Sequence, residues 1–307
     1  MGLSFEQEGS VPSSGVTFEV LTDVGLEIGE SPVWDAARGV LWFVDTLSPA
    51  VFCLMPSTRG VRAYPMPAAV GSLGLAHDGR LVVALRTGVH LFDPGSGTLA
   101  FLVHPEPDRG MNRLNDGKIG PDGCFWVGSM HDSLPRAPSG ALYRVTPAGD
   151  CTRILDGIKV SNGLAWSPDG RTMYHADSRG PFVRVFDFDV ASGGLANARL
   201  LLSLTEEQGL PDGAAVDRDG LYWSAGVTSG RINRIAPDGR LVDSIVLPVS
   251  APTMPCFGGA DMRTVYVTSL ASGRTGRHEA GTLIAFRSQV PGVPVGCFGG
   301  AWAGQGG

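Results

Sequence analysis

Four side chains that carry oxygen ligands occupy matching positions of an internal repeat. Each lies eight or nine residues before a turn glycine, and together they are Glu30, Asn115, Asn162 and Asp212. Two carboxylates held close together away from bulk water repel each other, and a divalent cation relieves that repulsion. Oxygen ligands suit Ca²⁺, Mg²⁺ or Mn²⁺, and carboxylates also bind Zn²⁺. The pattern predicts a binding site for one divalent metal ion.

Each of these residues alone also has a simpler explanation. Asn and Asp near the start of a strand often cap a turn or bond to the backbone, and for a single residue that explanation is the better one. It does not account for four oxygen side chains at one register. The matching positions of the other two units, near Gly71 and Met254-Pro255, carry no such ligand.

The repeat indicates which elements must position these side chains. Asp-Gly, which suits tight hairpin turns, follows short apolar runs at 78–79, 122–123, 169–170, 219–220 and 238–239. Six units begin, at spacings of 41–50 residues, near Glu30, Gly71, Asn115, Asn162, Asp212 and Cys256. That period is typical of four-stranded propeller blades, whose first strands line a central channel. The sequence predicts an all-β, six-bladed β-propeller. A two-sheet sandwich is the main alternative, but units of this length exceed simple hairpin steps.

The ends of the chain are expected to differ from its middle. We expect one propeller domain over residues 16–290, a polar tail at 1–15 and a Gly-rich tail at 291–307. The strand-like run at 16–24 precedes the first unit, so we expect it to pair with the last blade and close the ring. Residues 203–209 could form one turn of helix. Four tryptophans recur within the units and are expected in the blade cores, namely Trp34, Trp126, Trp166 and Trp223.

The composition argues against several classes of protein. Of 307 residues, 44 are Gly and 22 are Pro, which is too many for a helical bundle, and 43% hydrophobic content with a net charge of −6 argues against disorder. The acidic balance disfavours nucleic-acid binding, and no apolar run is long enough to cross a membrane. The first 15 residues do not resemble a signal peptide, and the five cysteines share no CxxC spacing. Reduced thiols and a cytoplasmic location are therefore expected. A monomer or dimer is expected because a closed ring leaves no long edge strand exposed.

Several longer motifs resemble one known family. Five of them, in this order, are similar to SMP-30/gluconolactonase/regucalcin-like proteins: GESPVWD (29–35), NRLNDGKIGPDG (112–123), SNGLAWSPDG (161–170), LPDGAAVDRDG (210–220) and PCFGG (255–259). The stretches 130–144 and 174–177 look most like bacterial sugar lactonases. The resemblance implies a six-bladed propeller that hydrolyses sugar-acid lactones with one divalent metal, whether Ca, Zn, Mn, Mg or Fe. It implies that Glu30, Asn162 and Asp212 bind the metal. It also implies that Arg113 and Asn115 face the substrate.

The chain departs from the family pattern in one place. Some animal members carry a substrate-contacting Glu shortly after the motif matching Ser129-Met130, where this chain has His131-Asp132-Ser133. Their sugar preference therefore does not transfer. His131 could bind substrate near the channel mouth, although a loop histidine more often has no such role.

The residues suit ester hydrolysis. Asp212 is the candidate general base for a water that attacks the lactone carbonyl, and Arg113 could donate to substrate hydroxyls or to the developing oxyanion. His175 is expected to pack inside a strand, and Asp116 to support its turn.

Two other functions stay open. The chain could be a calcium-binding or scaffold propeller with a structural metal, or a metal-dependent hydrolase of organophosphates or other esters. An arginine beside the ligands favours a small-molecule substrate, because a structural ion needs none. The sequence contains no GxSxG, P-loop, Rossmann or HExxH motif, so it gives no support to those mechanisms.

Overall fold

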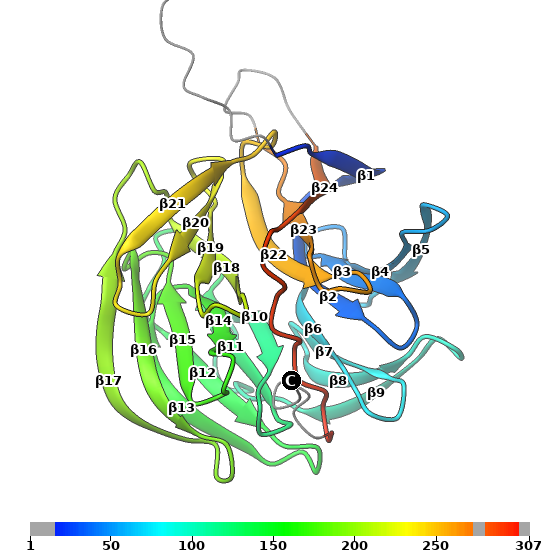
Figure 1. Cartoon of the computed structure of the whole chain (residues 1–307). Coiled ribbons are helices and arrows are strands. Elements are labelled where there is room, and N and C mark those ends of the chain that lie inside the picture. Colours follow the sequence, from blue (N-terminus) through cyan, green and yellow to red (C-terminus); the bar gives the residue numbers. More distant parts are fainter. Residues whose placement is uncertain (1–15, 273–279, 301–307) are drawn as a thin grey trace, which may run out of the picture.

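The computed structural model describes residues 16–272 and 280–300, which form six four-stranded antiparallel sheets arranged as blades around a central channel (Figure 1). This arrangement confirms the six-bladed β-propeller. In five blades the strands follow one another in sequence, so each chain segment runs as a meander from the channel to the outside.

The strands of the first three blades follow the order of the chain. Blade 1 contains β2 (Gly29–Asp35), β3 (Val40–Asp45), β4 (Ala50–Met55) and β5 (Gly60–Pro65). Blade 2 contains β6 (Val70–Leu75), β7 (Leu81–Leu85), β8 (Gly88–Asp93) and β9 (Thr98–Val103). Blade 3 contains β10 (Asn112–Ile119), β11 (Phe125–His131), β12 (Gly140–Val145) and β13 (Cys151–Ile158).

The remaining blades complete the ring. Blade 4 contains β14 (Ser161–Trp166), β15 (Thr172–Asp177), β16 (Phe182–Asp189) and β17 (Gly194–Ser203). Blade 5 contains β18 (Pro211–Val216), β19 (Tyr222–Gly226), β20 (Arg231–Ile235) and β21 (Leu241–Val246). Blade 6 contains β22 (Pro252–Gly258), β23 (Thr264–Ser269), β24 (Gly281–Arg287) and the N-terminal β1 (Glu19–Leu26).

The two ends of the chain meet in blade 6. β1 pairs antiparallel with β24, with Glu19 opposite Ala285 and Leu26 opposite Gly281. The predicted closure of the ring by the N-terminal strand is therefore confirmed. Because the first and last strands share one sheet, the ring cannot open without breaking this pairing.

The hydrophobic core lies between neighbouring blades. Each of six buried clusters combines side chains of two adjacent sheets. Trp126 and Trp166 meet edge to face across blades 3 and 4 with ring centroids 6.1 Å apart, and Trp223 packs on Phe257 across blades 5 and 6. Trp34 stacks on Tyr266 across blades 1 and 6. Trp126, Trp166 and Trp223 are buried core residues, as predicted, and the half-buried Trp34 packs against the core between blades 1 and 6.

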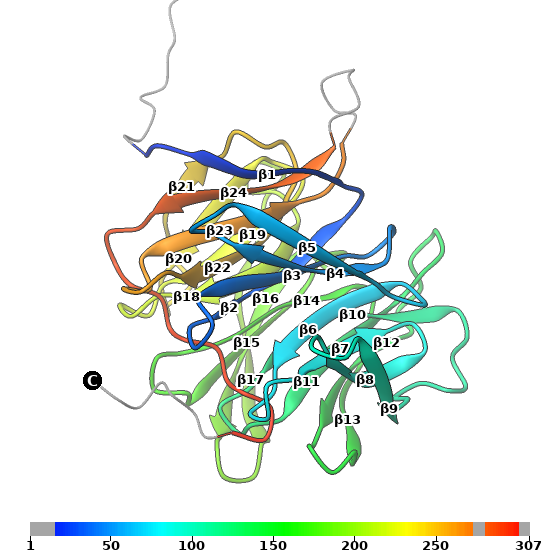
Figure 2. The ribbon, with the colours of Figure 1, turned by 90° about the vertical axis from the view of Figure 1, so that its right-hand side faces the viewer.

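The chain after β24 crosses the ring instead of leaving it. Both views show this red segment running from β24 toward the cyan and green blades (Figures 1 and 2). It forms isolated bridges from Gly292 to Asp217 and from Phe298 to Ala76, and Phe298 is buried. Residues 291–300 therefore pack on the ring, although the sequence predicted a tail from residue 291. The expected tails at 1–15 and 301–307 lie outside the described residues.

The helical turn expected at residues 203–209 is present as a single turn. Gly209 N donates to Thr205 O at 3.0 Å, which is the bond of one α-helical turn, and the turn does not extend into a helix. The part of the chain that the structure describes contains no helix long and apolar enough to span a membrane. All five cysteines are free thiols, as predicted.

Candidate active site

A cavity of about 430 Å³ opens at the end of the channel where the inner strands begin. All five predicted site residues line it: Glu30, Arg113, Asn115, Asn162 and Asp212. They come from the inner strands β2, β10, β14 and β18 of four blades. The opposite end of the channel holds a smaller, mainly apolar cavity covered by residues 293–295. Only the first cavity combines charged and amide side chains of several blades in the described parts of the channel.

A β-bulge interrupts each of these inner strands where its ligand-type residue lies. The register against the second strand shifts between Glu30 and Val33, between Leu114 and Gly117, between Asn162 and Ala165, and between Pro211 and Ala214. A bulge redirects side chains locally, so a position that would follow the sheet pleat can instead face the channel. Gly163 and Gly213, just after Asn162 and Asp212, are the sequence feature that indicates two of these bulges.

Two of the bulges require left-handed backbone. Gly163 has φ of 68°, and a Cβ there would lie 2.4 Å from the Tyr222 hydroxyl oxygen. Ser31 has φ of 49°, which costs a non-glycine residue about 1–2 kcal/mol. The Ser31 hydroxyl offsets part of that cost by accepting a hydrogen bond from Leu73 N at 3.0 Å, which ties blade 1 to blade 2.

A chain of hydrogen bonds orients the amides. Arg113 Nη1 donates to Asn115 Oδ1 at 2.8 Å, and Asn115 Nδ2 donates to Asn162 Oδ1 at 3.2 Å. Asn162 Nδ2 then donates to the Ser178 hydroxyl at 2.7 Å. Each amide therefore has its nitrogen engaged as a donor, which leaves oxygen lone pairs as the free ligand groups.

The carboxylates of the site carry an electrostatic penalty. Burial, followed by the negative charges of Asp212 and Asp116, raises the pKa of Glu30 well above its usual value. Burial and the charge of Asp116 raise the pKa of Asp212 as well. Burial lowers the pKa of the Arg113 guanidinium. The charges of Arg113 and of the buried Lys118 oppose these shifts without reversing them, so the carboxyl groups of Glu30, Asp116 and Asp212 are disfavoured in their charged form.

This donor set fits a divalent cation that prefers oxygen. Asp116 Oδ1 is a buried oxygen that accepts no hydrogen bond from the residues that the structure describes, so it has a lone pair unsatisfied beside the site. Within residues 16–272 and 280–300, no three His, Cys, Asp or Glu side chains are placed as a metal-binding group. A cation would instead use carboxylate and amide oxygens together, from Glu30, Asp212 and Asn162, with water completing its coordination.

An arginine rim, which the sequence motifs did not indicate, lies on the side of the cavity formed by blades 2 to 4. It consists of Arg86, Arg113, Arg136 and Arg179, of which the last three line the cavity. One carboxylate, Asp132, contacts the first three of these guanidinium groups. Asp132 lies in the stretch His131-Asp132-Ser133, where the chain departs from some animal relatives. That departure was the sequence feature that could have indicated the rim.

Three other residues of interest lie outside the cavity lining. His131 Nδ1 lies 3.0 Å from Ser133 O, within its own loop. His175 is buried with Nε2 2.8 Å from the Ser161 hydroxyl, and burial lowers its pKa to about 4, so it packs as a neutral side chain. Asp116 accepts a hydrogen bond from Leu164 N in the neighbouring blade, so it links two blades instead of supporting only its own turn.

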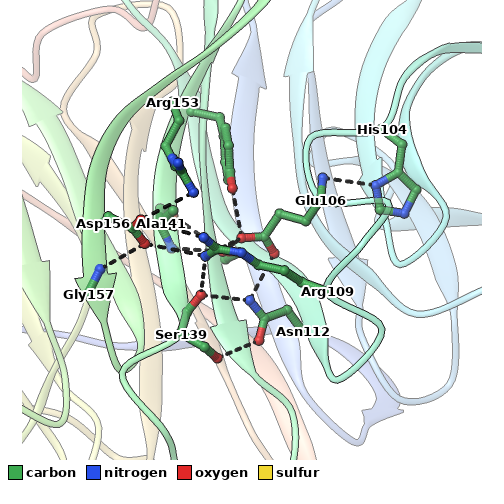
Figure 3. A network of polar contacts seen from close by, with 11 residues as sticks. His104, Glu106, Arg109, Asn112, Ser139, Ala141, Arg153, Asp156 and Gly157 are labelled. Carbon is green, nitrogen blue, oxygen red and sulfur yellow. Dashed lines mark hydrogen bonds and ion pairs between the residues drawn. The ribbon is translucent and has the colours of Figure 1, made fainter.

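A second buried carboxylate lies just before the strand that carries Arg113. Figure 3 shows Glu106 at the centre of a network with Arg109 and Asn112. Glu106 accepts hydrogen bonds from Asn112 Nδ2, the Ser129 hydroxyl and the Tyr143 hydroxyl at 2.8–3.0 Å. This network anchors the loop that leads into β10 against blade 3.

A six-bladed propeller with a mixed carboxylate and amide pocket at one mouth of its channel defines the class of this protein. Residues 28–271 match the family model described as SMP-30/Gluconolactonase/LRE-like region. The chain belongs to this family, as its motifs predicted.

Two curated relatives illustrate the range of the family. Regucalcin from Xenopus laevis is 34% identical over 265 residues, covering 85% of this chain and 89% of the relative. A 6-deoxy-6-sulfogluconolactonase from Pseudomonas putida is 36% identical over 280 residues, covering 89% of this chain and 95% of the relative.

Solved structures agree with the fold. A regucalcin from Agrobacterium tumefaciens, described as a calcium-binding protein, superposes with a TM-score of 0.85 at 26% identity, over 94% of this chain and 98% of that one. A gluconolactonase from Xanthomonas campestris superposes with a TM-score of 0.74 over 90% of each chain. At 24% identity, the second likeness supports the fold alone.

Proposed function

We propose that this protein is a lactonase that hydrolyses a sugar-acid lactone with the help of one divalent metal ion. The observation that carries the proposal is the convergence of Glu30, Asn162 and Asp212 in one cavity beside Arg113. The family match and the relative named 6-deoxy-6-sulfogluconolactonase support the lactone as the substrate class.

The metal would be held by Glu30, Asn162 and Asp212. When bound, a divalent cation polarises the carbonyl group of a substrate and stabilises negative charge on its oxygen. Which cation serves is open among Ca²⁺, Zn²⁺, Mn²⁺, Mg²⁺ and Fe²⁺, although the all-oxygen donor set favours a hard ion.

The reaction needs a base, an oriented substrate and a proton for the leaving oxygen. We assign Asp212 as the base. Its carboxylate accepts a proton from a water molecule while the oxygen of that water bonds to the lactone carbonyl carbon. The ring C–O bond then breaks, and the ring oxygen takes up the proton to become the free hydroxyl of the aldonic acid. Asp212 thereby returns to its starting state.

Arg113 and Asn115 would orient the substrate. Arg113 is held by Asp132 Oδ1, Leu114 O and Asn115 Oδ1 at 2.8–3.1 Å, so its guanidinium cannot swing freely. A fixed guanidinium can donate to the sugar hydroxyls or to the carbonyl oxygen as its negative charge develops. Asn115 fixes Asn162 in turn and so connects substrate binding to the metal ligands.

A second candidate function is calcium binding without turnover. It is favoured by the oxygen-only donor set and by the relatives named regucalcin, one of which is described as a calcium-binding protein. A hydrolase of other esters or organophosphates would use the same residues. Each alternative differs from the lactonase in what is turned over, so activity separates them.

The test is hydrolysis of pentono- and hexonolactones followed by proton release. The protein is stripped with a chelator, and each of the five cations is restored in turn, with spontaneous hydrolysis subtracted. We expect turnover that is lost on chelation and returns with at least one cation. Absence of turnover with every pair, in protein shown to be folded and to bind a cation, would contradict the lactonase and leave calcium binding.

A further inference from the structure

The arginine rim carries more positive charge than its surroundings neutralise. Asp132 lies 2.5 Å from Arg86 Nη1, 3.0 Å from Arg113 Nε and 3.9 Å from Arg136 Nη1. One carboxylate thus serves three guanidinium groups. Arg179 is exposed, lines the same cavity and makes no ion pair with another described residue.

The metal site does not supply the missing negative charge. Glu30 and Asp212 together carry two negative charges, and a divalent cation bound by them would cancel both. Buried Asp116 and Lys118 face each other with opposite charges. Of the rim, the three arginines that line the cavity, Arg113, Arg136 and Arg179, then exceed the single charge of Asp132 by two, and Arg86, outside the cavity lining, shares Asp132 with them. Such an excess at a cavity mouth attracts and retains an anion.

The guanidinium groups differ in how firmly they are already engaged. Arg113 has three hydrogen-bond acceptors and points toward the ligands of the metal site. Arg136 has one hydrogen-bond acceptor among the described residues, His131 O at 2.6 Å. Most of its five N–H donors can therefore bind a ligand. Arg136 and Arg179 therefore suit a group of the substrate other than its reacting carbonyl.

We propose that the preferred substrate is a lactone with an anionic group at the end away from its carbonyl, and that Arg136 and Arg179 select it. The anion would be a sulfonate, phosphate or carboxylate, since planar guanidinium groups bind all three through paired N–H donors. This inference rests on the proposed lactonase function. Arg136 and Arg179 would determine which sugar lactone is preferred, whereas the inner residues bind the metal and the reacting carbonyl group.

The first test compares matched lactones. Gluconolactone, its 6-phospho and 6-sulfo derivatives and glucarolactone are hydrolysed by the metal-loaded protein. We expect kcat/KM to be at least about tenfold higher for the anionic members, because hydrogen bonds to charged groups contribute about 1.5–3 kcal/mol. The differences among the three anions identify which group the rim accommodates best.

Variants then locate the preference. Arg136→Gln and Arg179→Gln are each expected to lower the ratio of anionic to neutral kcat/KM by about 10–100-fold, mainly through KM. Arg136→Lys should restore only part of the ratio, because an ammonium group lacks the paired donors. Arg199→Gln is the matched control, since Arg199 is exposed on the outer strand β17 and pairs with Asp187 there.

A binding measurement separates this inference from the proposed function. Calorimetry with the hydrolysed, ring-opened acids needs no turnover, and the 6-phospho and 6-sulfo acids should bind more tightly than gluconate, by a margin that Arg136→Gln reduces. Equal kcat/KM for neutral and anionic lactones would overturn the preference while leaving the lactonase intact. No hydrolysis of any lactone, together with Arg136-dependent binding of the anionic acids, would overturn the lactonase but support the rim as an anion site.

Discussion

Two buried carboxylate clusters lie at the same mouth of the propeller and are built in opposite ways. Around Glu106, the neighbours are donors: an amide, two hydroxyls and the Arg109 guanidinium at 3.6 Å (Figure 3). Around Glu30, burial and the negative charges of Asp212 and Asp116 raise its pKa more than the charge of Arg113 lowers it. The hydrogen bond that Glu30 accepts from a described residue comes from Ser31 N at 3.3 Å.

The difference separates a structural carboxylate from a ligand. A buried carboxylate that has all its donors contributes to the fold and has no need of a further partner. Carboxylates that raise one another's pKa are costly for the fold and become favourable when a cation binds. Asn112, which donates to Glu106, immediately precedes Arg113 in the chain. The hydrogen-bonded cluster around Glu106 therefore helps to position Arg113 beside the carboxylates of the cavity.

The substitution Asp212→Asn gives the largest expected effect and tests whether the cavity carboxylates serve the reaction and not the fold. We expect kcat/KM with metal and lactone to fall by about 10²–10⁴-fold, because the base and one metal ligand are lost together. The melting temperature of the metal-free protein should stay the same or rise, since one of the repelling charges is removed. Steady-state kinetics and thermal unfolding check both parts. Activity within a few-fold of the unaltered protein would contradict the role of Asp212.

The same kind of change at Glu106 should have the opposite effect on stability. Glu106→Ala is expected to lower the free energy of unfolding by about 3 kcal/mol, because each buried donor left without an acceptor costs about 1–3 kcal/mol. Chemical denaturation measures this loss, with Glu206→Ala as an exposed control. Glu106→Gln keeps an acceptor and should lose less than half as much. A loss below 1 kcal/mol for Glu106→Ala would mean that the network contributes little.

Removing the metal should affect only one of the two clusters. A cation present at about 100 times its dissociation constant stabilises the folded state by about 2.7 kcal/mol, so chelation should lower the melting temperature by several degrees. Asp212→Asn should abolish most of this response, whereas Glu106→Gln should keep it. A response of equal size in both variants would place the cation elsewhere.

The smallest effect is expected at Arg109. Arg109→Gln should cost about 1 kcal/mol or less, because this guanidinium and its second partner Asp156 are both partly in solvent, where ion pairs are weak. Chemical denaturation again provides the measurement. A loss as large as that of Glu106→Ala would show that the ion pair, and not the amide and hydroxyl donors, holds the carboxylate.

The site was predictable as far as it repeats. Asn115, Asn162 and Asp212 share one register before a turn glycine, and the blades place that register on one axis, so sequence counting was enough to bring them together. Their assigned roles in binding and catalysis remain predictions. The dipeptides Asn162-Gly163 and Asp212-Gly213 also indicate the bulges beside them, because a glycine inside a strand often marks a bulge.

The rim and the Glu106 network were not predictable in this way. Asp132 and Arg86 are 46 residues apart, and Glu106 is 37 residues from Tyr143, with no repeat that relates them. These contacts depend on the paths of loops between blades. The packing of residues 291–300 across the ring has the same origin, since Gly-rich composition does not distinguish a free tail from a packed segment.

The sequence by itself determined the number of blades, the closure of the ring and the repeated carboxylate and amide side chains that reach the channel. It could do so because hairpin turns and strand alternation are local, and the repeat carries local order around the whole ring. Tertiary structure alone decided which charges share a partner and which are left without one. That balance arises between residues distant in the chain, where burial strengthens every unpaired charge, and it separates the cluster that holds the fold from the cluster suited to bind a cation.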